Sequence, residues 1–239
     1  MKKILTIITG VLFACMVNAQ ETDNVAKWDF PVRYGTPEWE KLESFEERMM
    51  AYNIPDELIR KISTPELVKV CLAYPEWRLI HAFDDRRTGL SYIMSQFNGF
   101  HELLSRRDAT KELIRVYAKM DPLAIEDDWT AVQKGRYVFN ISYVELMLSV
   151  RRVIENLDEQ DRQALSNEVV LKYRQKKQRP DVYGLWELSP IAGLGLNIID
   201  RDGEFSKNDA KLRSLKQHFI TDDMEVLDRI FESVNSQKK

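Results

Sequence analysis

The residues best spaced to do chemistry lie between Asp200 and Asp209, in a segment that can be aligned with a calcium-binding loop. With Gly203 at the sixth position, Asp200, Asp202 and Asp209 fall at the third, fifth and twelfth positions, where such loops carry ligands. Two departures weaken the match: Ile198 stands first, where a carboxylate is needed, and Asp209 is shorter than the usual bidentate glutamate. A glycine turn leading into a helix is therefore the favoured prediction, with a calcium loop at these three aspartates as the alternative.

A second candidate is a basic cluster near the end of a predicted helix. Its members are Lys172, Arg174, Lys176, Lys177 and Arg179. Such a cluster can bind an anionic partner, such as a phosphate-rich surface or acidic lipid headgroups. It can equally complement the negative carboxyl end of the helix dipole and remain solvated, and this second interpretation is favoured.

Other residues that could do chemistry are few. His81, His101 and His218 are the three histidines, and none has a partner at the spacing that aims two ligands at one ion, so we predict no metal site here. Cys71 lies on an apolar helical stripe and is predicted to be a buried, inert thiol. No cofactor motif is present: Gly193 and Gly195 lack a GxGxxG frame and indicate close helix packing.

No catalytic residue can be assigned from sequence motifs. The chain has no GxSxG nucleophile elbow. Carboxylates can still meet in space without a mark in the sequence, and the nearest cluster is Glu126, Asp127 and Asp128 beside Trp129. An acidic, solvated linker is the favoured interpretation of that cluster.

The elements that must position these residues are predicted to be helices. Four prolines, each followed by an acidic residue, stand where a first helical turn accepts them: Pro37, Pro55, Pro65 and Pro75. No run of alternating apolar residues predicts a strand with confidence, apart from an extended segment over residues 20–35. The fold class is therefore all-α, a compact array of antiparallel helix pairs around a central helix near 136–157.

Residues 95–109 are predicted to be a corner between helices. Phe97 ends one apolar stripe, Asn98-Gly99 interrupts the helix, and Asp108 is placed to cap the next helix. Phe97, Phe100 and Leu104 are expected to face inward, while His101 and Glu102 face solvent.

A possible subdomain boundary within the helical domain 20–239 falls near 121–135, where a proline, acidic residues and a glycine form a long connection.

The first nineteen residues are predicted to be a signal peptide. Two lysines precede an apolar run, and Val17-Asn18-Ala19 matches a signal-peptidase site. Its removal takes away two lysines and no acid, which moves the formal net charge from −3 to −5 and argues against a dedicated nucleic-acid binder.

Cys15 lies in a stretch resembling a lipobox, although Phe13 departs from the small residue usual there, so lipid anchoring at Cys15 is the alternative. We predict no transmembrane span in the mature chain.

Three segments carry a resemblance to a family. They are STPELVKVCLAYPEW at 63–77, FNGFHELLSRRDA at 97–109 and ELIRVYAKMD at 112–121. They resemble the segments ST-x-x-L-V-x-x-C-L-x-Y-P and F-N-G-x-x-E-L-L-x-R-x-D-A of a family of exported, all-helical proteins from Bacteroidetes-type bacteria. The resemblance covers roughly sixty residues by this alignment, and it implies export and a helical fold but no activity.

These observations favour an exported, non-catalytic helical protein of the bacterial envelope, periplasmic or secreted, that binds another envelope or secreted protein. Two alternatives stay open. One is a hydrolase that uses dispersed carboxylates, which would require a cleft with clustered acids and a strongly raised carboxyl pKa. The other is an outer-membrane lipoprotein anchored at Cys15.

We predict that the exported form begins at Gln20, because cleavage after Ala19 fits the signal-peptidase site. The intact mass of the protein purified from its native host measures this directly. A diacylated species that begins at Cys15 would contradict the prediction and support lipid anchoring.

Overall fold

The computed structural model describes residues 26–236, and all regular structure in this range is helical. The predicted signal peptide and its cleavage site lie outside the described residues. The α-helices are α1 (Phe45–Ala51), α2 (Asp56–Ile59), α3 (Thr64–Leu72), α4 (Arg86–Gln96), α5 (Asn98–Ser105), α6 (Ala109–Lys119), α7 (Ala131–Leu148), α8 (Arg151–Glu155), α9 (Glu159–Lys177), α10 (Leu185–Ile199), α11 (Ala210–His218) and α12 (Met224–Ser236). Two 3-10 turns, η1 (Trp39–Lys41) and η2 (Trp77–Ala82), complete the set. The all-α prediction is confirmed.

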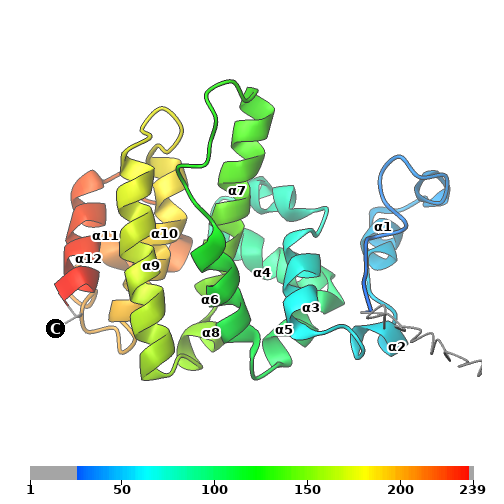
Figure 1. The fold of residues 1–239 in the computed structure, drawn as a ribbon, viewed down its shortest axis with the longest axis horizontal. Helices are drawn as coiled ribbons and strands as arrows, with labels where there is room; N and C mark the ends of the chain where they lie inside the picture. Colours follow the sequence, from blue (N-terminus) through cyan, green and yellow to red (C-terminus); the bar gives the residue numbers. More distant parts are fainter. Residues whose placement is uncertain (1–25, 237–239) are drawn as a thin grey trace, which may run out of the picture.

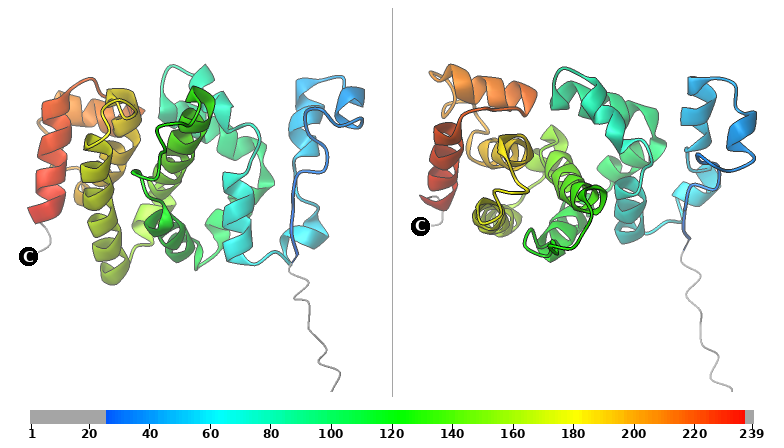
Figure 2. Two further views of the ribbon diagram at one scale, coloured as in Figure 1. Left: turned by 45° about the horizontal axis from the view of Figure 1, so that its top comes forward. Right: turned by 90° about the horizontal axis from the view of Figure 1, so that it is seen from above.

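Helices that follow one another in the chain lie side by side along the long axis of the molecule. Figure 1 shows α1 and α2 at one end and α11 and α12 at the other, and the two further views in Figure 2 agree. Two helices form the centre: α7 packs on α6 and α10, and α10 also packs on α9, α11 and α12. One continuous hydrophobic core runs through the described residues, from Phe30 near the start to Val234 in α12.

The predicted central helix 136–157 is two helices, which corrects that prediction. The chain leaves the helical path at Val150, whose backbone is extended, and α8 follows it. Ser149 lies at the break, and its hydroxyl donates to the Glu145 carbonyl at 2.7 Å, a contact that often bends helices. The Ser149 carbonyl in turn accepts from the Asn197 side chain of α10 at 3.1 Å. The Ser149 carbonyl therefore accepts from a side chain of α10 and not from a backbone amide of the next turn of its own helix.

Side-chain caps and prolines fix where several helices begin. Ser44 and Thr130 each form a reciprocal capping box with the residue three positions on, Glu47 and Gln133. Only two of the four predicted proline starts produce α-helices, at Pro55 and Pro65, and these open α2 and α3. The other two, Pro37 and Pro75, precede the 3-10 turns η1 and η2.

The extended N-terminal segment is anchored by aromatic rings. Phe30 is buried and packs edge-on against Tyr52 at a ring separation of 5.9 Å, and lies 5.6 Å from Phe97. Tyr52 also lies 5.3 Å from Trp39, and the Trp28 indole donates to the Tyr52 carbonyl at 3.0 Å. This aromatic cluster holds the segment, η1 and α1 on the helical body.

The segment predicted as a possible subdomain boundary, 121–135, is tied to α9 and to the residues that follow it. Its last five residues belong to α7, and the rest is a loop. Arg179 donates to the Ile125 carbonyl at 2.9 Å, Tyr183 donates to the Pro122 carbonyl at 3.1 Å, and Gln175 donates to the Asp121 carboxylate at 3.1 Å. These bonds satisfy backbone groups that a free linker would leave to water.

The predicted corner at 95–109 is present, with three corrections of detail. Phe97 and Phe100 are buried and His101 is exposed, as expected, but Leu103 is fully buried whereas Leu104 is only half-buried. Asn98 begins α5, and its side chain accepts from the Ile54 amide at 2.9 Å and donates to the Ile54 carbonyl at 2.7 Å.

Two polar residues of this corner are engaged in unexpected contacts. Glu102 accepts from Arg106 at 2.9 Å, and the Arg106 guanidinium donates to the Ile59 carbonyl at 2.9 Å and to the Ile62 carbonyl at 2.7 Å. Asp108 does not cap α6 with its side chain, because its carboxylate accepts from the Thr64 hydroxyl at 2.9 Å. Glu102 thus orients the arginine that closes the end of α2.

Close packing explains the two glycines of α10. A Cβ added at Gly193 would meet the Phe219 ring at 2.0 Å, and one at Gly195 would meet Ile230 at 3.3 Å. Phe219 ends α11 in the left-handed conformation, with φ 56°, and its ring is buried. The prediction that these glycines allow close helix packing is confirmed.

We predict that Phe100→Ala lowers the free energy of unfolding by about 3–5 kcal/mol, because it opens a cavity among buried rings. His101→Ala should change it by less than about 0.5 kcal/mol, because the imidazole is exposed. Urea unfolding of the two variants beside the unaltered protein gives both values. Equal losses would mean that the corner depends on the histidine.

Candidate functional site

The basic cluster of α9 does not form one surface, which corrects the sequence-based interpretation for two of its members. Lys172 and Lys176 are buried side chains with 1% and 0% of their surface exposed. Of the remaining members, Lys177 pairs with Asp228 of α12 at 2.7 Å. The cluster therefore divides between the core and the surface.

Lys176 belongs to a buried ion pair at the centre of the molecule. Its ammonium donates to both oxygens of the Glu145 carboxylate, at 2.7 and 2.8 Å, and Glu145 is likewise 0% exposed. The Tyr117 hydroxyl of α6 donates to the same carboxylate at 3.0 Å. One carboxylate of α7 thus joins α6 to α9.

Burial opposes charge on both partners of the ion pair. Burial raises the pKa of the Glu145 carboxyl, and the Lys176 ammonium and Tyr117 hydroxyl offset only part of that effect. Burial likewise lowers the pKa of the Lys176 ammonium, with Glu145 acting against it. Both groups are therefore balanced between desolvation and mutual attraction.

Lys172 lies one turn before Lys176 and serves the neighbouring connection. Its ammonium donates to the Met120 carbonyl at the end of α6 at 2.6 Å, and it pairs with Glu168 at 3.1 Å. Its ammonium also lies 5.0 Å from the centre of the Tyr117 ring. Two lysines of one helix stripe thus hold α6 and α7 from the same side.

The sequence contained a signal for this buried group. Lys172 and Lys176 lie four residues apart and continue the apolar stripe of Leu165, Val169 and Tyr173. Glu145 is likewise the one charged residue in the buried run from Ile141 to Leu148. A charged residue on each of two core-facing stripes indicates a buried pair, whereas counting positive charges alone indicates a surface patch.

The ion pair is closed to a substrate. None of the described cavities is lined by Glu145 or Lys176. A raised carboxyl pKa in a cleft would favour a hydrolase, but this carboxyl is in the core. Among residues 26–236, Asp161 is the other carboxyl with a raised pKa, caused by partial burial and by Asp158, and neither of these two aspartates lines a described cavity. The arrangement of Glu145 and Lys176 is structural.

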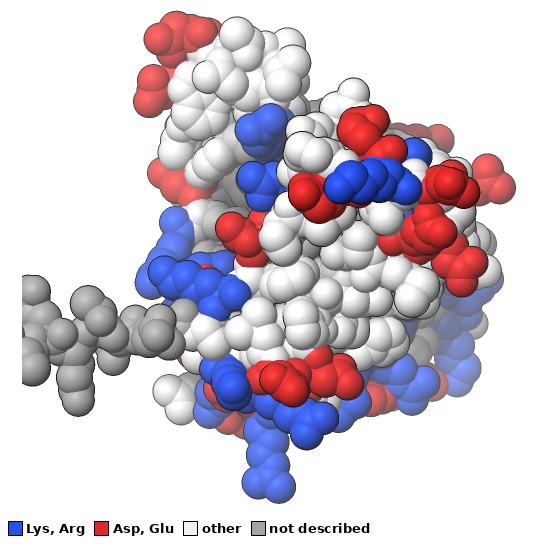
Figure 3. All heavy atoms as spheres, turned by 90° about the vertical axis from the view of Figure 1, so that its right-hand side faces the viewer, with Lys and Arg blue, Asp and Glu red and all other residues white. Residues whose placement is uncertain are grey.

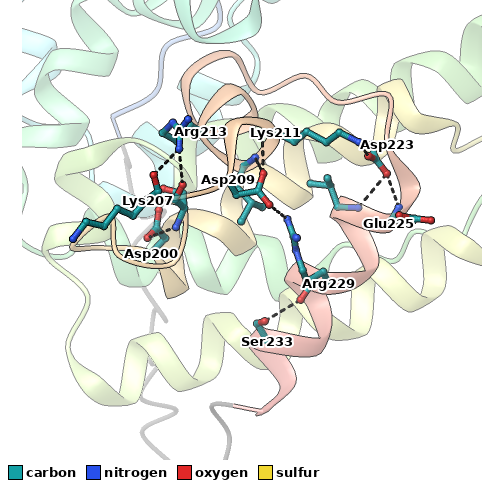
Figure 4. A network of polar contacts seen from close by, with 12 residues as sticks. Asp200, Lys207, Asp209, Lys211, Arg213, Asp223, Glu225, Arg229 and Ser233 are labelled. Atoms are coloured by element: carbon teal, nitrogen blue, oxygen red, sulfur yellow. Dashed lines mark hydrogen bonds and ion pairs between the residues drawn. The ribbon is translucent and has the colours of Figure 1, made fainter.

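The three aspartates of the possible calcium loop each have protein partners, and Figure 4 shows Asp200 and Asp209 pointing to different neighbours. Asp200 is buried and accepts from Lys216 at 2.8 Å and from the Ser206 amide at 3.2 Å. Asp202 accepts from the Glu204 amide at 3.1 Å. Asp209 caps α11 and pairs with Arg229 of α12.

The same segment shows the predicted glycine turn. Gly203 has φ 82°, a conformation that side chains rarely adopt, and α11 begins shortly after it. Within residues 26–236 no group of three or more metal-ligating side chains is placed to hold an ion. Asp209 and Arg229 instead join the start of α11 to α12, as Figure 4 shows.

An open, polar cleft lies where the Ser149 break meets the α10–α11 turn. Its volume is about 540 Å³. Its buried side chains are Ser149, Ile154, Asn197 and Asp200, and its half-buried ones are Arg87 and Lys216. Its exposed residues are Arg151, Glu155, Arg201 and Asp202. This cleft is a candidate binding site that no sequence pattern indicated.

The remaining candidates from the sequence are surface groups or isolated side chains. Asp127 pairs with Arg179 at 3.2 Å, and Glu126 and Asp128 are exposed. Cys71 is buried, as predicted, and burial raises the pKa of its thiol well above the usual value. His81 is exposed beside Phe139 at a ring separation of 5.0 Å.

No helix among the described residues is long and apolar enough to cross a membrane. Comparison with known proteins finds no family model, no curated protein and no solved structure that matches the chain. Inference about function therefore rests on the geometry of the molecule.

We predict that Lys176→Met lowers the free energy of unfolding by about 3–5 kcal/mol, because it leaves the Glu145 carboxylate buried without its counter-charge. Adding Glu145→Leu should recover part of that loss, because two apolar residues remove both desolvation costs. Urea unfolding of the two single variants and the double variant measures the coupling. If the two losses simply add, the pair is not energetically coupled and this account of it fails.

Proposed function

We propose that this chain is an exported, non-catalytic helical protein of the bacterial envelope that binds another protein through its N-terminal end. The observation that carries the proposal is the exposure of large apolar side chains there. Tyr34 is 81% exposed, Met50 63% and Phe45 50%, and among the described residues only Val132 elsewhere is as exposed. Aromatic residues and methionine are the types enriched at protein interfaces.

The distribution of charge at this end of the molecule supports a protein partner. Figure 3 views the molecule from this end, and its centre is largely uncharged, with acidic and basic side chains gathered toward the margins. Exposed apolar patches rimmed by polar residues are typical of interaction sites. The aromatic cluster around Phe30 and Tyr52 holds the segment in place, so little ordering would be needed on binding.

Charge indicates what kind of partner would fit. Residues 36–50 contain five acidic side chains, Glu38, Glu40, Glu43, Glu46 and Glu47, against two basic ones, Lys41 and Arg48. All five acidic residues are exposed. We therefore expect the partner to present an apolar groove bordered by lysine and arginine, and the association to weaken as salt is added.

Photo-crosslinking in the native envelope tests the proposal. A photoreactive residue placed at Phe45 or Met50 should give one discrete crosslinked protein, whereas the same residue at Val132 or Leu171, exposed apolar positions elsewhere, should not. Once purified, that protein should bind the unaltered chain, and Phe45→Ser with Met50→Gln should weaken binding at least about tenfold, since anchor residues dominate interface energy.

The same variants should unfold at nearly the same urea concentration as the unaltered protein, because exposed positions contribute within about 0.5 kcal/mol. Equal crosslinking at all four positions, or binding that is unaffected by the double substitution and by salt, would contradict the proposal. Export is tested separately by the mass of the mature chain.

A further inference from the structure

The polar cleft beside the Ser149 break has a composition that selects ligands. Its ten lining residues include four basic side chains, Arg87, Arg151, Arg201 and Lys216, and three acidic ones, Glu155, Asp200 and Asp202. Pairing between these groups decides which charges remain available. The cleft lies between α8, α10 and α11, far along the chain from the N-terminal apolar residues, and the inference is independent of the proposed function.

Two of the basic residues are neutralised by protein carboxylates. Arg151 pairs with Glu155 at 2.7 Å across one turn of α8. Lys216 pairs with Asp200 at 2.8 Å. Although burial opposes ionisation of Asp200, hydrogen bonds from Lys216 and Ser206 hold the pKa of its carboxyl below the usual value. Asp200 is therefore a carboxylate that compensates Lys216 in the floor of the cleft.

The other two basic residues have no carboxylate partner among the described residues. Arg87 is half-buried, and one end of its guanidinium donates to the Lys216 carbonyl at 2.6 Å while the group lies 4.7 Å from the centre of the Phe219 ring. Its Nε is buried without an acceptor. Arg201 is exposed and makes no hydrogen bond or ion pair within residues 26–236.

The Asp85 carboxylate forms no ion pair with Arg87, although its charge favours the guanidinium, and burial still lowers the pKa of that group. An anion bound directly to the guanidinium would therefore stabilise its charge further. Contacts to carbonyls and to an aromatic ring orient the Arg87 guanidinium but do not neutralise it. Arginine binds planar and tetrahedral oxyanions through paired N–H donors. The neighbouring floor residues Ser149 and Asn197 are fixed by their own hydrogen bonds and can contact the polar body of a ligand.

We propose that this cleft binds a small molecule through a carboxylate or phosphate group, with Arg87 at the wall and Arg201 at the rim as the residues that contact the oxyanion. The volume of about 540 Å³ is within the range of small-molecule sites. Asp202 at the rim carries the same charge as the ligand and limits its affinity.

Titration of the purified protein with inorganic phosphate, and separately with citrate, tests this site at constant ionic strength. Calorimetry should show saturable binding at one site, and the backbone amide resonances of Ser149, Asn197 and Arg201 should move in step. Saturation by phosphate alone assigns the site to phosphate groups, saturation by citrate alone assigns it to carboxylates, and either result supports the proposal.

Three variants localise the site. Arg201→Gln and Arg87→Gln should each weaken binding about tenfold or more, the usual effect of losing a charge-assisted hydrogen bond. Asp202→Asn should strengthen it, which a purely structural role would not produce. Arg136→Gln, an exposed arginine outside the cleft, is the matched control and should leave binding unchanged.

Arg201 is fully on the surface, so its variant keeps the test meaningful even if Arg87→Gln fails to fold. Absence of saturation with both anions would overturn the proposal. Equal weakening by Arg201→Gln and Arg136→Gln would do the same, because it would show general charge attraction and no site.

Discussion

The ion pair between Glu145 and Lys176 is the interaction on which the arrangement of the helices depends. Both side chains are withdrawn completely from water, and such a pair is tolerated only where each charged atom has partners. The carboxylate of α7 meets that condition by accepting from α9 and from Tyr117 of α6 at the same time. Any movement of one of these three helices that separated them would leave a charge buried without compensation.

This constraint fixes the register of α9 as well as its position. Lys172 reaches the end of α6 while Lys176 reaches Glu145 in the last turn of α7, and the two lysines lie one helical turn apart on α9. Sliding α9 by a turn would place Lys172 near Glu145 but would bring the half-buried Glu168 to the Met120 carbonyl, to which a carboxylate cannot donate. Apolar packing alone tolerates such shifts more readily, because contacts between aliphatic side chains are not directional.

The sequence predicts the helical class well because it depends on local signals. The apolar stripes and the proline starts at Pro55 and Pro65 are short-range patterns of this kind. The capping boxes at Ser44 and Thr130 are local as well, but they were not predicted. The break at Ser149 could not be predicted in this way, because Asn197, almost fifty residues later, stabilises it. The same limit applies to the sites: Arg87 and Arg201 are far apart in the chain, and only the packing of α4 on α11 and of α11 on α10 brings them to one cleft.

The buried charged groups and the exposed side chains therefore have different roles. The Glu145 carboxyl and the Lys176 ammonium, whose pKa values are shifted by burial, lie in the core, where they hold helices together and cannot reach a substrate. The groups left at the surface are unpaired arginines beside the Ser149 break and apolar side chains on the N-terminal segment. Those groups suit recognition, since an arginine without a counter-ion attracts an oxyanion and an exposed aromatic residue attracts an apolar groove. A rigid core with its charges compensated internally is what allows both surfaces to keep their shape without a ligand.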